Sequence, residues 1–300
     1  MKPLNIGKHT FDWGARTYVM GILNITPDSF SGDGLLSSPI FEENGGGQVG
    51  ANIALAQGRS FLASGADILD VGGESTRPGS EPLDAQAEMA RVIPVVQALS
   101  KEFPETLISI DTYKAVVAEE ALKAGAQIVN DVWALRADPA LAGVVAKYNA
   151  TVILMHNRSN PASVEVRAQL GNAYIGAEYD DLLEDVKREL MDSVRLAKQA
   201  RIPDERIILD PGIGFGKTVA HNLELIRRLD EIRALGYPVL LGTSRKSFIG
   251  FTLDLPADQR VEGTAATVSV GITRGADIIR VHDVEHMVRI AKMTDAIVRS

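Results

Sequence analysis

The amino-acid sequence predicts a single (β/α)8 barrel, a TIM barrel, with a short N-terminal hairpin. Eight short apolar segments rich in Val and Ile recur along the 300 residues. None alternates apolar with polar residues, which is typical of parallel strands covered on both faces. Helix-length segments separate most of them, and no Ser-, Pro- or charge-rich linker divides the chain. A doubly wound open sheet alternates in the same way and is the competing architecture.

The expected strands are Val19–Asn24, Asp67–Val71, Leu107–Asp111, Gln127–Asp131, Thr151–Met155, Arg206–Asp210, Pro238–Gly242 and Asp277–Val281. The expected helices are Asp84–Lys101, Ala115–Ala124, Asp180–Gln199, Leu223–Leu235, Glu262–Thr273 and Glu285–Val298. Asp180–Gln199 is the clearest helix, because its apolar side chains fall on one stripe at helical spacing.

The residues before the first barrel strand are expected to cap the bottom of the barrel. The chain then divides into an N-terminal segment, 1–18, and a barrel, 19–300. Leu4–Lys8 and Arg16–Tyr18 could pair as the hairpin. The Gly-, Ser- and Asn-rich segment Gly32–Gly50 is expected to form a long loop after the first strand.

The overall charge and composition exclude several classes of protein. The 31 basic and 39 acidic residues give a net charge of −8, which argues against a general nucleic-acid binder. The absence of cysteine excludes disulfides, thiolate catalysis and cysteine-based metal sites. No apolar stretch approaches the roughly 18 residues that span a bilayer, and the N-terminus lacks a signal-peptide pattern. We therefore expect a cytoplasmic protein that binds neither nucleic acid nor membrane.

Polar residues follow each predicted strand, at the end that faces the C-terminal mouth of a barrel. Barrel active sites are built at that mouth. A single Asp in such a place often caps the next helix instead. Many carboxylates and amides that converge without a ligand would be poorly satisfied, so the whole set predicts a binding pocket.

Two kinds of ligand chemistry can be separated within this set. Asp111, Asn130 and Asp210 combine acceptors and a donor, as needed to grip the edge of an aminopyrimidine. Met155 and Phe215 could contact such a ring, although ordinary packing would also explain them.

The second kind is anionic, because positive side chains follow the last two strands. Lys246, Arg280 and His282, with Arg245, indicate a phosphate or diphosphate site. A surface salt bridge is the alternative for Arg245, and a helix cap is the alternative for His282. Asn24 could supply one oxygen to a Mg²⁺ ion that also binds phosphate oxygens.

Two long motifs resemble the signatures of the dihydropteroate synthase family. They are MGILNITPDSFS at residues 20–31 and DILDVGGESTRPG at residues 67–79. DPGIGFGK at 210–217 and GTSRKS at 242–247 follow in order, so the resemblance covers nearly the whole chain after Tyr18. The run Gly-Asp-Gly at 32–34 departs from the usual Asp-Gly-Gly, and the loop after it looks long. Because both departures lie in this first loop, the resemblance does not predict how the loop closes over the site.

The resemblance implies a transferase of folate biosynthesis. The family joins 6-hydroxymethyl-7,8-dihydropterin diphosphate to para-aminobenzoate, giving 7,8-dihydropteroate and pyrophosphate. It also implies a Mg²⁺ cofactor, a homodimer and a para-aminobenzoate site that sulfonamides occupy. A small apolar segment, Gly263–Gly271, would suit a close helix contact between subunits or packing onto the barrel.

Residue roles are carried over by position from the same resemblance. The pterin diphosphate site would comprise Thr76, Asp111, Asn130, Met155, Asp210, Lys246, Arg280 and His282. The para-aminobenzoate site would comprise Arg77, Pro78, Phe215 and Ser247. Asn24 would bind the metal, and Lys246, Arg280 and His282 would act in catalysis by positioning and charge.

Two rival functions share parts of this pattern. A pterin-dependent methyltransferase would use the same aminopyrimidine grip, but it needs no diphosphate site. A catalytically silent paralogue should have lost charged residues at the mouth. The positive residues at the mouth therefore favour the synthase over both alternatives.

Overall fold

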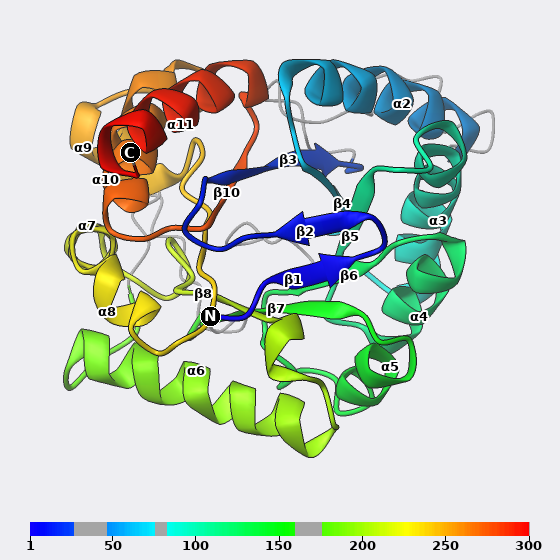
Figure 1. Ribbon diagram of the computed structural model, residues 1–300, viewed down its shortest axis with the longest axis horizontal. Helices are drawn as coiled ribbons and strands as arrows, with labels where there is room; N and C mark the ends of the chain where they lie inside the picture. The colour runs from blue at the N-terminus through cyan, green and yellow to red at the C-terminus, as the bar shows by residue number, and fades with distance from the viewer. Residues whose placement is uncertain (27–46, 76–82, 160–175, 300) are drawn as a thin grey trace.

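Eight parallel strands form a nearly closed barrel surrounded by helices, and a two-stranded hairpin lies across one end (Figure 1). The structure is a computed structural model that describes residues 1–26, 47–75, 83–159 and 176–299. The barrel strands are β3 (Tyr18–Asn24), β4 (Ile68–Gly72), β5 (Leu107–Asp111), β6 (Ile128–Asp131), β7 (Thr151–Met155), β8 (Ile207–Asp210), β9 (Leu240–Leu241) and β10 (Ile278–Val281). The predicted fold class is confirmed.

The strands follow one another around the barrel in sequence order. Hydrogen bonding runs from β8 through β7, β6, β5, β4 and β3 to β10 and β9. A parallel bridge between Leu209 and Val239 links β8 to the residue before β9. The backbone amide of Leu209 also donates to the carbonyl of Pro238 at 2.9 Å. These contacts close the ring, whereas an open doubly wound sheet would leave its edge strands unpaired.

The outer helices match most of the expected ones to within a few residues. They are α2 (Gly47–Ser64), α3 (Ala85–Glu102), α4 (Ala115–Ala124), α5 (Leu141–Lys147), α6 (Leu182–Gln199), α7 (Val219–Arg227), α8 (Leu229–Arg233), α9 (Ser247–Leu253), α10 (Val261–Thr273) and α11 (Val284–Val298). Asp84 and Asp181 cap α3 and α6, each accepting hydrogen bonds from two backbone amides of the first turn.

The helices differ from the expected ones in three places. The helix α2 begins at Gly47, inside the segment expected to be a loop, because its glycines obscured the helical pattern. The short helices α5 and α9 were not predicted. The single helix expected at Leu223–Leu235 is two helices, broken at Arg228.

The N-terminal hairpin has different strands from those predicted. β1 (Leu4–Ile6) pairs with β2 (His9–Phe11), and Gly7 takes a positive φ of 56° in the two-residue turn between them. Arg16 instead forms an isolated bridge with Trp13. The expected pairing was wrong because the turn-forming Gly7-Lys8 lay inside the segment that was read as one strand.

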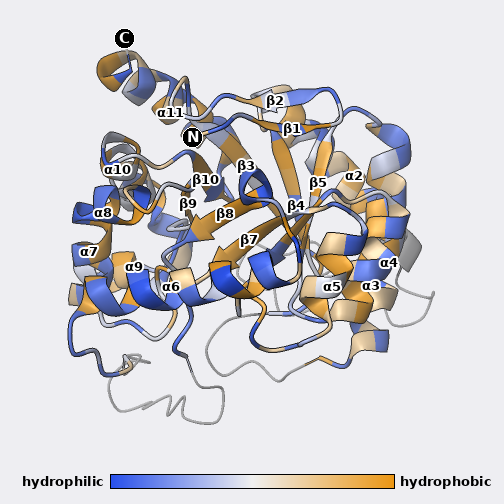
Figure 2. Cartoon of the chain, turned by 60° about the horizontal axis from the view of Figure 1, so that its bottom comes forward, coloured by the Kyte–Doolittle hydropathy of each residue, from blue (hydrophilic) through white to orange (hydrophobic). Residues whose placement is uncertain are grey.

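The hairpin packs onto the end of the barrel where the strands begin. One buried cluster joins its side chains to two residues from β3 and one from each of the other barrel strands: Leu4, Ile6, Phe11, Tyr18, Met20, Ile68, Leu107, Ile128, Ile153, Ile208, Leu240 and Ile278. Figure 2 shows the hairpin above the apolar strands. This apolar plug closes one end of the barrel, so polar chemistry is confined to the other end. No helix among the described residues is long and apolar enough to cross a membrane.

Candidate active site

The candidate site lies one layer above the apolar plug inside the barrel. Because side chains alternate along a strand, the residue two positions after each plug residue points to the same interior. The strand register aligns some of these residues, such as Asp70 with Ser109 and Met155 with Asp210, and staggers others, because Asn130 pairs with Ile153 and Arg280 pairs with Met20. Eight such residues point into the barrel. They are Ile22, Asp70, Ser109, Asn130, Met155, Asp210, Gly242 and Arg280. Asn24 and Asp111 continue the same alternation toward the mouth. The structure therefore directs the predicted residues Asn24, Asp111, Asn130, Met155, Asp210 and Arg280 into the same barrel interior.

Arg280 from β10 is held by two carboxylates across the barrel. Its Nε donates to Oδ2 of Asp70 at 2.6 Å, and its Nη2 donates to Oδ2 of Asp111 at 2.7 Å. Asn130 donates from Nδ2 to the same oxygen of Asp70 at 3.2 Å. Four strands thus meet in one polar network at the centre of the barrel.

Burial shifts the protonation of this network. It raises the pKa of Asp111 to about 7, against the opposing effect of Arg280. Burial would lower the pKa of Arg280, but the carboxylates of Asp70 and Asp111 outweigh it and raise the pKa. The guanidinium therefore stays charged while Asp111 is poised between its two forms near neutral pH.

A second pair, Asp210 and Lys246, faces this network. A Cβ built on Gly242 would lie 4.0 Å from Oδ2 of Asp210 and 3.9 Å from Nζ of Lys246. The absence of a side chain at Gly242 therefore leaves open space between the two charges. Burial lowers the pKa of Lys246 to about 8 and raises the pKa of Asp210.

Lys246 also links this pair to the aromatic wall of the mouth. Its Nζ donates to the backbone carbonyl of Ile213 and lies 4.8 Å from the ring centre of Phe215. Such a cation–π contact places the half-buried Phe215 next to the charged pair. Ser247 is exposed at the start of α9, one residue further along.

The positive residues after the last strands divide into two groups. In the first group, His282 contacts Ser244. The Oγ of Ser244 lies 3.0 Å from Nδ1 of His282 and accepts a hydrogen bond from the backbone amide of His282 at 3.1 Å. Arg245 instead donates from Nε and Nη2 to the carboxylate of Asp283. Arg245 therefore forms a salt bridge, as the alternative supposed, but the pair is largely buried and does not lie on the surface.

The remaining predicted residues have simple placements. Met155 is buried on β7 and pairs in register with Asp210 of β8. Thr76, Arg77 and Pro78 lie outside the described residues, as does most of the long first loop.

Asn24 is suited to a metal ion that also binds substrate. A Cβ on Gly72 would lie 3.7 Å from both Oδ1 of Asn24 and Oδ2 of Asp111, so the two oxygens border the same open space. Among the described residues, no cluster of three His, Asp or Glu side chains could hold a metal alone. Mg²⁺ commonly uses one or two protein oxygens together with phosphate oxygens and water, which fits this donor set.

Comparison with known proteins identifies the family. The model of the family described as "Pterin binding enzyme" matches residues 20–282. The dihydropteroate synthase of Clostridium beijerinckii is 48% identical over 297 residues, which cover 99% of this chain and 100% of that protein. This chain belongs to the dihydropteroate synthase family. The resemblance seen in the sequence motifs is confirmed, and with it the assignment to a transferase of folate synthesis.

Solved structures of other family members support the same conclusion. The dihydropteroate synthase of Clostridium difficile, solved in the presence of pteroic acid, is 47% identical with a TM-score of 0.84, covering 97% of this chain and 100% of that chain. The Yersinia pestis enzyme, solved with a sulfonamide drug, is 38% identical with a TM-score of 0.86 and 99% coverage of both chains. The shared barrel thus extends over nearly the full length of each member.

Two buried residues in or next to the site, Asp70 and Lys217, were assigned no role from the sequence. Asp70 is the only charged residue within β4, and its inward position, two residues after Ile68, was the signal available. Lys217 is also buried, which a lysine next to a glycine-rich loop gives no reason to expect.

Proposed function

We propose that this chain condenses 6-hydroxymethyl-7,8-dihydropterin diphosphate with para-aminobenzoate at the C-terminal mouth of its barrel. The observation that carries the proposal is the polar layer inside the barrel, where Asp111, Asn130 and Asp210 converge with Arg280 and Lys246. Carboxylates and an amide suit the amino, ring N–H and carbonyl groups of a pterin, and Met155 supplies an apolar surface beside them.

The reaction breaks the bond between the pterin methylene carbon and the diphosphate oxygen. The electron pair leaves with the diphosphate, so negative charge grows on the leaving group. Lys246, Arg280 and His282 would stabilise that charge, together with Thr76. Arg280 would also hold Asp70 and Asp111 in place through the contacts described above.

The aromatic amine then bonds to the methylene carbon and gives up a proton. Phe215 and Ser247, with Arg77 and Pro78, would hold para-aminobenzoate and orient its nitrogen. No strong general base is needed, because a neutral aniline is already nucleophilic. The chain's contribution is therefore positioning and electrostatic stabilisation.

A Mg²⁺ ion bound through Asn24 and the substrate diphosphate would supply further positive charge to the leaving group. We propose that the enzyme is located in the cytoplasm, because its proposed substrates are small soluble molecules.

The functional unit is proposed to be a homodimer. The surface formed by α7, α9 and α10 exposes Leu223, Phe251, Leu253 and Val270, four large apolar side chains on neighbouring helices. Gly263 and Gly271 do not contribute to it, because a Cβ on either would meet Leu253 or Leu241 of the same chain. Packing onto the chain's own α9 and β9 accounts for these glycines.

The function is tested by mixing the protein with Mg²⁺, the pterin diphosphate and para-aminobenzoate. We expect pyrophosphate to be released and dihydropteroate to form. Continued turnover should require para-aminobenzoate. Absence of release above the level without enzyme would reject the proposed reaction. Sedimentation of the same preparation and of Phe251→Glu tests the dimer, which the charged substitution should dissociate.

A further inference from the structure

A buried lysine lies behind the aromatic wall of the proposed site. Lys217 follows the glycine-rich loop after β8, and its side chain is 2% exposed. Its Nζ lies 2.9 Å from each of three acceptors: Nδ1 of His156 and the backbone carbonyls of Gly212 and Phe215. Burial lowers the pKa of Lys217, but the carboxylate of Asp210 opposes that shift. The three acceptors match the three donors of an ammonium group.

The two carbonyls belong to the ends of one tight turn. The amide of Phe215 donates to the carbonyl of Gly212 at 3.1 Å, which defines the turn. The amide of Gly212 donates to Oδ1 of Asp210 at 2.7 Å. Lys217 therefore binds the end of the turn that contacts Asp210 and also the end that carries Phe215.

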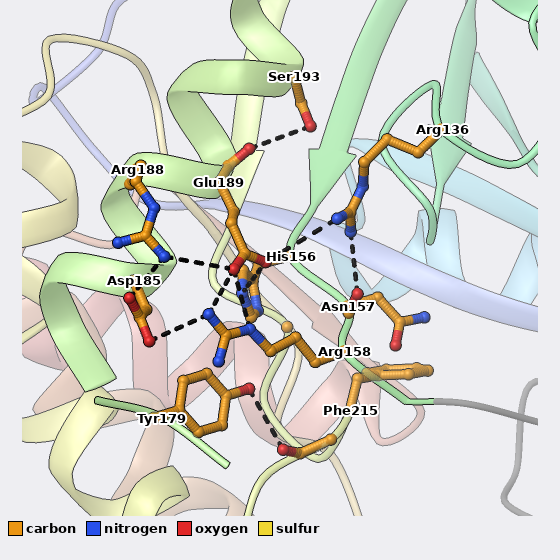
Figure 3. A network of polar contacts seen from close by, with 12 residues as sticks. Arg136, His156, Asn157, Arg158, Tyr179, Asp185, Arg188, Glu189, Ser193 and Phe215 are labelled. Carbon is orange, nitrogen blue, oxygen red and sulfur yellow. Dashed lines mark hydrogen bonds and ion pairs between the residues drawn. The ribbon is translucent and has the colours of Figure 1, made fainter. Parts of the chain in front are cut away.

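The other side of Lys217 contacts His156, which links it to α6. Figure 3 shows His156 next to Glu189 of that helix. When Lys217 is charged its ammonium can only donate, so Nδ1 of a neutral His156 is then the acceptor and Nε2 carries the ring proton. Nε2 lies 3.1 Å from Oε2 of Glu189, although not in line with it. Burial, followed by the nearby Lys217, lowers the pKa of His156 to about 4, so the imidazole is neutral near pH 7.

Glu189 is in turn fixed by a second cation. Nε of Arg158 donates to Oε1 of Glu189 at 2.9 Å. Nη2 of the same arginine lies 3.0 Å from Oδ2 of Asp185. The contact with His156, together with Arg158, lowers the pKa of Glu189 to about 2. The carboxylate is therefore charged over the whole working range of pH, which keeps the anchor intact.

The turn is also held from its far end. The hydroxyl of Tyr179 donates to the carbonyl of Gly216 at 3.2 Å, and the amide of Ala177 donates to the same carbonyl at 2.9 Å. Tyr179 packs under Arg158, whose Cζ lies 4.3 Å from the ring centre. Thus the segment after β7 and the helix α6 together hold the loop that carries Phe215.

We propose that Lys217 is a positioning residue that sets the place of Phe215 relative to Asp210, and so couples the para-aminobenzoate subsite to the pterin subsite. This rests on the proposed function, in which those two residues contact the two substrates. Lys217 itself touches neither substrate. Its ammonium acts through the turn, and His156 and Glu189 hold it in position.

A purely structural role would predict a different result. If Lys217 only stabilised the fold, its loss would lower the melting temperature and the amount of active protein, with both substrate constants unchanged. The proposed role predicts a selective loss at the second substrate. Pterin diphosphate binding measured alone and KM for para-aminobenzoate therefore separate the two explanations.

The experiment compares Lys217→Met with the parent enzyme and with Lys123→Met, an exposed lysine on α4. Wild-type turnover is measured first, because its absence would reject the proposed function and not this inference. In Lys217→Met, KM for para-aminobenzoate should rise at least tenfold, while calorimetric affinity for the pterin diphosphate changes less than threefold. Lys123→Met should match the parent. Unchanged KM in a folded Lys217→Met protein, or equal losses at both substrates, would overturn the proposal.

Two further variants keep the test decisive if Lys217→Met fails to fold. Tyr179→Phe removes only the hydroxyl that holds Gly216, and it should raise KM for para-aminobenzoate several-fold with the pterin affinity retained. Phe215→Ala should raise the same KM, and adding Tyr179→Phe to it should have little further effect, because both changes act on one ring. Additive effects of the two substitutions would contradict the proposed coupling.

Discussion

The guanidinium of Arg280 binds the carboxylate of Asp70, with Nε of the arginine 2.6 Å from Oδ2 of the aspartate. Asp70 is fully buried, and its other oxygen has no hydrogen-bond partner within the described residues. The pair joins β10 to β4 through the interior of the barrel. An unsatisfied carboxylate oxygen at that position is costly in the free protein and is available to a ligand that brings a donor.

The first prediction concerns the geometry of Arg280. Arg280→Lys keeps the positive charge but cannot reach Asp70 and Asp111 with two fixed donors. We expect kcat/KM to fall by a factor of about 10² to 10³, as when a charge-stabilising donor is removed from an active site. Arg280→Met should lose a similar or larger factor and also about 3–5 kcal/mol of stability, because it leaves buried carboxylates unpaired. Steady-state kinetics and thermal unfolding check both variants. Arg280→Lys with parent-like kinetics would contradict the assigned role.

The second prediction concerns the alkaline limb of activity. With a pKa of about 8, Lys246 loses its charge as the pH rises above that value, so kcat/KM should fall on this side. Stability should respond in the opposite direction. Between about pH 8 and the ordinary value of 10.5 the unfolded chain binds more protons, so the contribution of Lys246 to the free energy of unfolding increases with pH.

Activity and unfolding should therefore be measured over the same range, from pH 7 to 10. Lys246→Arg serves as the control, because arginine keeps its charge throughout. Its activity will be lower, but the limb near pH 8 should be absent. If that limb persists in Lys246→Arg, another group is responsible for it.

The third prediction uses the open space beside Gly242. The methyl group of Gly242→Ala would make only ordinary contacts with Arg280, Lys246 and Asp210, at 3.9–4.0 Å. The fold should tolerate it, with a melting temperature close to that of the parent. Because the methyl group projects between the proposed pterin contacts, affinity for the pterin diphosphate should fall at least tenfold, measured by calorimetry.

Gly143→Ala provides the matched control for Gly242→Ala. Gly143 lies on α5, and a Cβ there would meet nothing within 4 Å. Alanine in a helix interior should stabilise the protein by about 0.5–1 kcal/mol and leave substrate binding unchanged. Normal pterin binding by Gly242→Ala would mean that the ligand does not occupy the space between Asp210 and Lys246.

These predictions depend on side-chain directions that the sequence could only partly predict. The barrel strands were predicted to within a residue or two at most ends, because each is a short apolar segment with clear flanks. The polar residues at the mouth were predicted as a set. Within the adjacent pair Asn130 and Asp131, only Asn130 was assigned to the site, although both residues lie at the end of the same predicted strand.

The structure resolves that pair through the alternation of the strand. Asn130 follows the plug residue Ile128 at the period of two and faces Asp70. Asp131 points outward, where it accepts hydrogen bonds from the amides of Trp133 and Leu135 and shapes the next turn. The alternative that an Asp after a strand caps the next helix does not hold for Asp131, because α5 begins after Ala140 and Asp131 instead binds amides of the intervening turn. Asp210 combines both roles, since it points into the barrel and also accepts from the amide of Gly212.

Long-range partners were beyond the reach of sequence reasoning for a different reason. The pairing of Arg245 with Asp283 joins residues 38 positions apart, and the contact of Lys217 with His156 joins residues 61 positions apart. Both depend on which loops the barrel places next to one another. Motif spacing specifies neither contact, so Lys217 was visible only as the last residue of a glycine-rich motif.

The last prediction separates the stability of the barrel from its chemistry. Phe11 is buried in the hairpin, where its ring lies 4.5 Å from that of Tyr18 and 5.3 Å from that of Trp13. Phe11→Ala should cost about 3–5 kcal/mol of stability, since it empties part of the apolar plug. KM for both substrates should stay at the parent value at temperatures where the variant is folded, because the mouth lies at the opposite end of the strands. Chemical denaturation and kinetics on the same sample measure the two effects. A selective rise in either KM would show that residues 1–18 influence the mouth, and would contradict their proposed role as a cap on the bottom of the barrel.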